Sequence, residues 1–133
     1  PFLSGASLSI EDLQRRLGAL REGHRPSRAE VSALLAGASR REILSRVLRN
    51  LKAVHVMAEQ FDQALVATDR IVMLTPGAAT EIRDRGWLYR RLDCFAAALA
   101  DYRRYLELAP AAADADQARQ AVIELERLAA RLN

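Results

Sequence analysis

The sequences FDQAL (residues 61–65) and MLTP (residues 73–76) decide the fold of this chain, because both recur further along it. FAAAL stands at residues 95–99 and ELAP at residues 107–110, and each lies 34 residues after its counterpart. A single offset that brings several residue types into register indicates an internal repeat. The stretch from residue 45 to residue 110 is therefore predicted to hold two copies of one structural unit.

A period of 34 residues is typical of the tetratricopeptide helix-turn-helix repeat and differs from the periods of ankyrin and leucine-rich units. In each unit a first helix must approach a second helix closely, so a small residue is needed early in the second. Ala64 and Ala98 supply it, and Phe61 and Phe95 are expected at the turn between the two helices. The prolines of MLTP and ELAP should end the second helices, because the residue before a proline disfavours helical geometry.

The predicted architecture is all-α, a tetratricopeptide-type helical repeat of seven helices in an open right-handed curl. Its parts are a tail or linker from an upstream domain at residues 1–8, an N-terminal helical pair at 9–38, two repeats at 39–110 and a C-terminal capping segment at 111–133. Within the last two parts, helices are expected at residues 39–59, 62–75, 79–92, 95–108 and 113–132. A final capping helix suits a short solenoid, whose terminal repeats otherwise expose an apolar face.

Three capping boxes, each a serine followed three residues later by an acid, mark expected helix starts in the first third of the chain. Residues 9–12 (SIED) should open a helix that ends near Glu22. Residues 27–30 (SRAE) should open a short helix that Gly37 closes, since glycine is favoured just past a helix end. Residues 39–42 (SRRE) should open the first helix of the repeats.

The composition fits a single α-helical domain. The chain has 133 residues, half of them hydrophobic and only 5% aromatic, which suits close helix packing. Its 20 basic and 17 acidic side chains are interleaved along the helices, the usual pattern of solvated helix faces. One cysteine rules out an internal disulfide and fits a reducing compartment. With no apolar run long enough to span a bilayer and no leader signal, a cytoplasmic protein is predicted.

Several short sequences in the chain match a known bacterial family more closely than they match the general repeat pattern. They are LRNLKA (residues 48–53), EIRDRG (81–86), LY (88–89), LDC (92–94) and DYRRYL (101–106). Over residues 9–110 the chain resembles the C-terminal half of SirB-type proteins, which join a transglutaminase-like domain to tetratricopeptide repeats. The opening Pro1-Phe2 also resembles the family's junction between these parts. The resemblance implies that the chain starts where the papain-like domain ends, and it carries over no catalytic residue.

The residues that could carry chemistry are few. Cys94 as a nucleophile would need a nearby histidine and a lowered pKa. His24 and His55 are the only histidines, and neither has a spacing that suggests a dyad with Cys94 or a metal-ligand set. We therefore expect structural roles for Cys94 and His55, with no catalytic residue, metal or cofactor in this chain, and no enzyme activity.

A concave groove is the expected functional site. Peptide ligands of these repeats usually touch the second, fifth, ninth, twelfth and thirteenth positions of a unit, and Ser45 and Ala79 are taken as the first positions. The predicted partner-binding residues are Arg46, Arg49, Asn50, Arg83, Trp87, Arg90 and Arg91. A tryptophan among arginines is typical of an interface hot spot and predicts an acidic or C-terminal carboxylate peptide as ligand. The alternative is that Arg90 and Arg91 are solvated helix-end residues and Trp87 covers the cap.

Asn50 and Arg85 occupy positions with a specific meaning in the repeat pattern. Asn50 occupies the position of an asparagine in carboxylate-clamp repeats, but Ala53 replaces the second asparagine, so a chaperone-tail clamp is not predicted.

Arg85 occupies an inward position that the repeat pattern gives to leucine, and an arginine there must be paired or must extend to solvent. Glu81 or Asp69 is its expected partner, which would make Arg85 a structural link between the two repeats.

Three further possibilities remain open at this point. The module could be an accessory or regulatory domain that packs on an upstream transglutaminase-like domain. It could bind nucleic-acid phosphates through a basic cluster, which comprises Arg25, Arg28, Arg40, Arg41, Arg46, Arg49 and Lys52. It could also form a homodimer through an apolar helix face at either end of the repeat.

Overall fold

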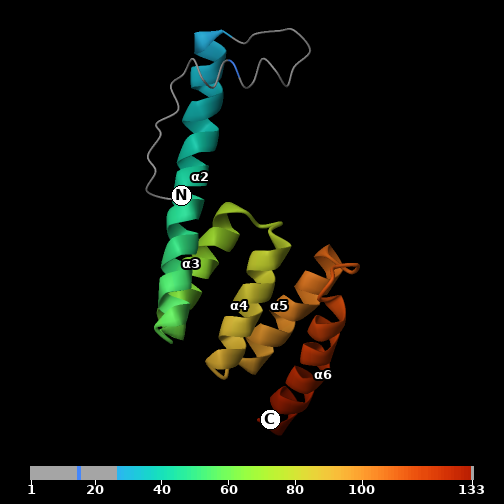
Figure 1. Ribbon diagram of the computed structural model, residues 1–133. Coiled ribbons are helices and arrows are strands. Elements are labelled where there is room, and N and C mark those ends of the chain that lie inside the picture. Colours follow the sequence, from blue (N-terminus) through green and yellow to red (C-terminus); the bar gives the residue numbers. More distant parts are fainter. Residues whose placement is uncertain (1–14, 16–26, 133) are drawn as a thin grey trace. The chain divides into compact units, whose positions relative to one another are not determined.

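The computed structural model of the chain describes residue 15 and residues 27–132 (Figure 1). The chain divides into two compact units, residues 1–44 and 45–133, and each is described by itself. Every regular element among the described residues is an α-helix, which confirms the all-α prediction. The predicted tail at residues 1–8 and the helix expected at 10–22 lie outside the described residues, except that Arg15 is helical.

Helix α2 (Arg28–Met57) begins as the capping box predicts but runs past the expected break. The Ser27 amide donates to Glu30 Oε2 at 2.7 Å, and the Glu30 amide donates to Ser27 Oγ at 3.2 Å. The prediction that Gly37 closes a short helix, and that a new one opens at residue 39, is wrong. Gly37 has no left-handed φ and open space around it, so it sits in the helix at a cost of about 1 kcal/mol relative to alanine.

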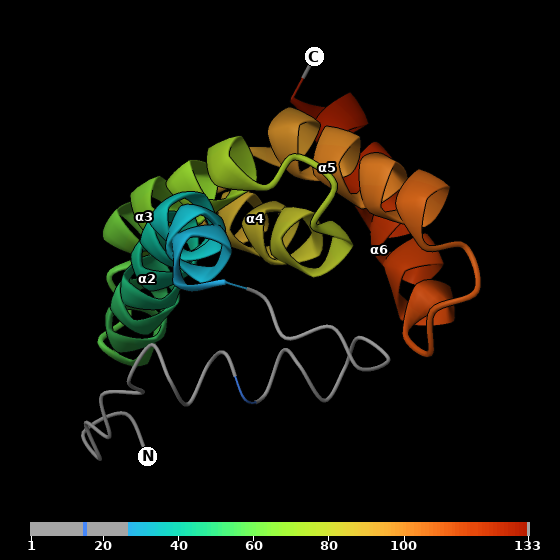
Figure 2. The same ribbon diagram turned by 90° about the horizontal axis from the view of Figure 1, so that it is seen from above.

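Four further helices follow in the unit 45–133. They are α3 (Phe61–Leu74), α4 (Ala79–Arg91), α5 (Phe95–Leu108) and α6 (Ala115–Arg131). Both views show them side by side in chain order, and α3 contacts α4, α4 contacts α5 and α5 contacts α6 (Figures 1 and 2). The predicted bounds of α3, α4 and α5 agree with the structure to within one residue.

The two turns that join the helices of each repeat have the same backbone geometry. Glu59 and Asp93, 34 residues apart, adopt φ values of 56° and 59°, and they are the non-glycine residues with positive φ in the described chain. The next amides also match, since Gln60 N donates to His55 O at 2.8 Å and Cys94 N donates to Tyr89 O at 2.9 Å. The sequence repeat is therefore a repeat of backbone conformation.

Small residues allow the close helix contacts that the repeat requires. Ala64 and Ala98 are fully buried, as predicted. A Cβ added at Gly86 would lie 3.1 Å from the Tyr102 ring and 3.2 Å from Asp101 Cβ, tighter than ordinary van der Waals contact. Glycine at this position lets α4 approach α5 and brings the Tyr102 ring close to the α4 backbone.

The core between α5 and α6 is built from alanines, two tyrosines and one leucine. Its buried members are Ala98, Tyr102, Tyr105, Ala118, Ala121 and Leu125. Because alanine side chains are short, α6 packs closely on α5 along this face. This contact positions α6 opposite α4, across Tyr102.

Candidate functional site

A groove of about 550 Å³ lies between α4 and α6, with α5 beneath it. We call it the α4–α6 groove. Its lining residues are Arg83, Asp84, Trp87 and Arg90 on α4, Tyr102 on α5, Gln117, Ala118 and Ala121 on α6, and Asp114 directly before α6. The volume lies within the range of small-ligand and side-chain pockets.

Trp87 is held in place by two neighbours and keeps part of its ring exposed. Its ring meets the Phe61 ring edge-on, with the centroids 5.6 Å apart and the planes at 83°. The Arg91 guanidinium carbon lies 4.8 Å from the Phe61 centroid and 5.7 Å from the Trp87 centroid. The Trp87 residue is 39% exposed. The tryptophan is thus ordered in advance and still available for contact.

Two ion pairs connect α4 to the α6 side of the groove. Arg83 Nη1 donates to Asp114 Oδ2 at 2.8 Å, and Arg90 Nη2 donates to Glu124 Oε2 at 2.6 Å. Trp87 lies between Arg83 and Arg90 along α4, one helical turn from each. The groove therefore has a central section beside Trp87 and a carboxylate-paired arginine on either side of it.

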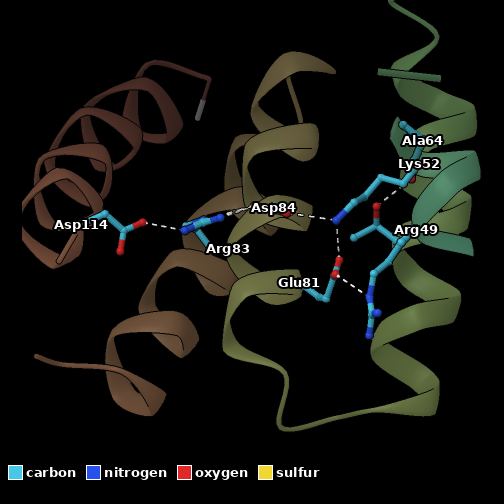
Figure 3. A network of polar contacts seen from close by, with 8 residues as sticks. Arg49, Lys52, Ala64, Glu81, Arg83, Asp84 and Asp114 are labelled. Atoms are coloured by element: carbon cyan, nitrogen blue, oxygen red, sulfur yellow. Dashed lines mark hydrogen bonds and ion pairs between the residues drawn. The ribbon is translucent and has the colours of Figure 1, made fainter. Parts of the chain in front are cut away.

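The pair at Arg83 belongs to a longer chain of charges that links α2, α4 and the start of α6 (Figure 3). Arg83 also donates from Nη2 to Asp84 Oδ1 at 2.9 Å. Lys52 Nζ donates to Asp84 Oδ2 at 3.0 Å and to Glu81 Oε2 at 2.6 Å. Arg49 Nε lies 3.7 Å from Glu81 Oε1. Positive and negative groups alternate along this chain, so the basic residues of the face are largely compensated.

Hydrogen bonds keep the Arg83 and Asp114 charges in place. The Tyr105 hydroxyl and then Arg83 donate to Asp114, and both bonds lower the pKa of that carboxyl. The bond to Asp114 also raises the pKa of Tyr105. Partial burial alone would lower the pKa of Arg83, but its bonds to Asp84 and Asp114 outweigh burial and raise the pKa. The Arg83–Asp114 pair is therefore charged at neutral pH.

Arg85 links the two repeats, as predicted. Its partners are Asp69, which was expected, and Asp101, which was not. Nη1 donates to Asp69 Oδ1 on α3 at 2.9 Å. Nε and Nη2 donate to the two Asp101 oxygens on α5 at 2.7 and 2.8 Å, and these bonds are the main cause of the raised pKa of Arg85. The prediction of Glu81 as a partner is wrong, because Glu81 pairs with Lys52 and Arg49 of α2.

The predicted binding residues fall into two groups in the structure. Arg83, Trp87 and Arg90 line the α4–α6 groove, and Arg91 lies beside Trp87. The three residues predicted on α2 do not line it. These are Arg46, Arg49 and Asn50, all exposed on that helix.

The α6 side of the groove was missed, although a signal for it was present. If the 34-residue offset is applied once more, residue 113 becomes the first position of a third unit. Asp114, Gln117 and Ala121 then take the second, fifth and ninth positions, and all three line the groove. Helix α6 therefore occupies the position of the first helix of a further unit.

Cys94 and His55, the residues considered for catalysis, make hydrogen bonds to other groups and not to each other. The exposed Cys94 thiol donates to the Leu92 carbonyl at 3.6 Å. His55 Nδ1 lies 2.9 Å from Gln60 Oε1. In the part of the chain that the structure describes, no cluster of three histidine, cysteine or acidic side chains could hold a metal ion. Over the same residues, no helix has both the length and the apolar character needed to cross a bilayer.

Antiparallel helices pair through a repeated turn, and the groove lies between the first helices of successive units. These features define a helical-repeat interaction module. The tetratricopeptide repeat family matches residues 51–122, which is more than half of the chain. The chain therefore belongs to the tetratricopeptide repeat family. No solved structure gives a significant match to it.

The curated relatives are bacterial, and the SirB name that the resemblance predicted occurs among them. A UPF0162 protein of Xylella fastidiosa is 35% identical over 125 residues, which cover 94% of this chain and 44% of the relative. The UPF0162 protein YchA of Escherichia coli is 35% identical over 69 residues, 52% of this chain and 26% of the relative. Protein SirB1 of Salmonella typhimurium is 32% identical over the same shares of the two chains. The chain spans less than half the length of these relatives.

Proposed function

We propose that this module binds a peptide segment of a partner protein in the α4–α6 groove, by recognition alone and without catalysis. Tetratricopeptide repeats are protein-interaction modules, and this groove supplies a specific surface for that role. The observation that carries the proposal is the partly exposed Trp87 ring beside a concave space, since buried tryptophans dominate many interfaces. Phe61 and Arg91 already hold the ring, so binding requires little reorganisation.

The proposal is tested by selecting peptides from a random phage-displayed library on the wild-type protein. Selected peptides are then measured against Gln117→Trp, which places a large ring into the groove from its exposed rim. We expect this variant to weaken binding at least about tenfold. The matched control is Gln120→Trp, which makes the same change one turn further along α6 at an exposed position outside the groove lining. Equal binding by both variants would contradict the proposal.

A second candidate function is favoured by an apolar stripe on α2. Val47, Leu51 and Val54 follow one another at helical spacing and are 43%, 43% and 60% exposed. Such a stripe is a suitable surface for packing against another folded domain. The chain's relatives are more than twice as long as the region they share with it. An accessory role, in which the module packs on the transglutaminase-like domain that the resemblance implies, is therefore the alternative proposal.

A further inference from the structure

The α4–α6 groove has an uncharged centre between two satisfied ion pairs, and this decides the chemistry of its occupant. On α6, Ala118 and Ala121 lie between Asp114 and Glu124 in the sequence, and they line the groove together with Trp87 on α4. Tyr102 on α5 lines the groove as well, and it is buried together with the two alanines. The central section is therefore bounded by two aromatic rings and two methyl groups.

The arginines on either side have little to offer a ligand carboxylate. Arg83 already donates to Asp114 at 2.8 Å and to Asp84 at 2.9 Å. Arg90 donates to Glu124 at 2.6 Å. Because a carboxylate already compensates the charge of each arginine, a peptide carboxylate would meet a guanidinium with little net positive charge and would gain little free energy. The expectation of an acidic or C-terminal carboxylate ligand depended on free arginines, which the groove does not present.

We propose, on the basis of the proposed peptide-binding function, that the groove accepts a large apolar side chain of an uncharged peptide segment as its anchor. The anchor, such as phenylalanine, tryptophan, leucine or methionine, inserts between Trp87 and Ala121 and lies over Tyr102. Large apolar anchors in preformed pockets supply most of the affinity at such interfaces. The exposed Gln117 amide at the rim can both donate to and accept from the peptide backbone, which suits a neutral segment.

The test uses the display-selected peptides, synthesised with acetylated and amidated ends so that no terminal charge contributes. Trp87 is the single tryptophan of the sequence, so in the wild-type protein its fluorescence reports the binding of peptides that lack tryptophan. We expect a shared large apolar residue in the selected peptides, and its replacement by alanine should weaken binding at least about tenfold. Raising sodium chloride from about 50 to about 500 mM should change the affinity less than about threefold, because no ion pair is formed.

The variant Glu124→Gln separates the two ligand chemistries, because it releases Arg90 from its carboxylate. It should leave the affinity for apolar-anchored peptides within about twofold, whereas an acidic ligand would gain affinity from the free guanidinium. Selected peptides that bind in the groove through acidic residues, with a steep loss in salt, would overturn the apolar-anchor proposal and leave the proposed function standing. If Gln117→Trp leaves the affinity for the selected peptides unchanged, both the apolar-anchor proposal and the proposed function are overturned.

Discussion

Replacement of Arg85 by methionine is expected to lower the free energy of unfolding by about 3 kcal/mol. The Arg85 side chain is 21% exposed and that of its main partner Asp101 is 9% exposed. Removing the guanidinium leaves the Asp101 carboxylate in this partly buried position without its two short bonds, and it also breaks the bond to Asp69 on α3. Equilibrium unfolding in urea, followed by circular dichroism, measures the loss.

The matched control for this change is Arg104→Met. Arg104 donates to Glu107 at 3.0 Å, but both side chains are more than half exposed, so the cost should stay within about 0.5 kcal/mol. The double variant Arg85→Met with Asp101→Asn should be more stable than the sum of its single variants predicts, by about 1 kcal/mol or more, because the unpaired charge is gone. Equal costs for Arg85→Met and Arg104→Met would show that the link between the repeats contributes little.

Truncation of Leu125 to alanine should cost about 3 kcal/mol. Leu125 is fully buried in the contact between α5 and α6, and its loss leaves a cavity among short alanine side chains that cannot fill it. Since each helix of a repeat protein packs on its neighbours, and α6 packs on α5, the loss should appear first as faster amide hydrogen exchange in α6. The α6 side of the groove would then open more often.

The control for Leu125→Ala is Leu132→Ala, the same truncation at a residue that is 71% exposed beyond the end of α6. Its cost should not exceed about 0.5 kcal/mol. If α6 exchange rates are unchanged in Leu125→Ala, the packing of α6 on α5 does not control the groove.

The repeat could be predicted in detail because its signals are local and occur twice. Phenylalanine, alanine and proline at fixed offsets gave the bounds of α3, α4 and α5, and the turns at Glu59 and Asp93 share one geometry. Gly37 was misjudged for a physical reason. A glycine commonly ends a helix when it adopts a left-handed conformation, but Gly37 has no left-handed φ and α2 continues through it.

The candidate site could be predicted only in part, because charge compensation depends on contacts between distant residues. The repeat positions of Arg83, Trp87 and Arg90 predicted a groove from the residue pattern, and these three residues line the α4–α6 groove in the structure. The partners Asp114 and Glu124 lie 31 and 34 residues further along the chain, and no local pattern marks them as ion-pair partners. The same holds for Asp101, 16 residues from Arg85. The sequence thus predicted the arginines but not that carboxylates already pair with them.

The most direct test of the central claim is the amide spectrum of the isotopically labelled protein, recorded by nuclear magnetic resonance as a selected peptide is added. If the α4–α6 groove is the recognition surface, the largest shifts should fall on the Trp87 indole and on the amides of Gln117 and Ala121. Shifts concentrated instead on Val47, Leu51 and Val54 of α2 would contradict the account and favour the apolar stripe as the binding surface.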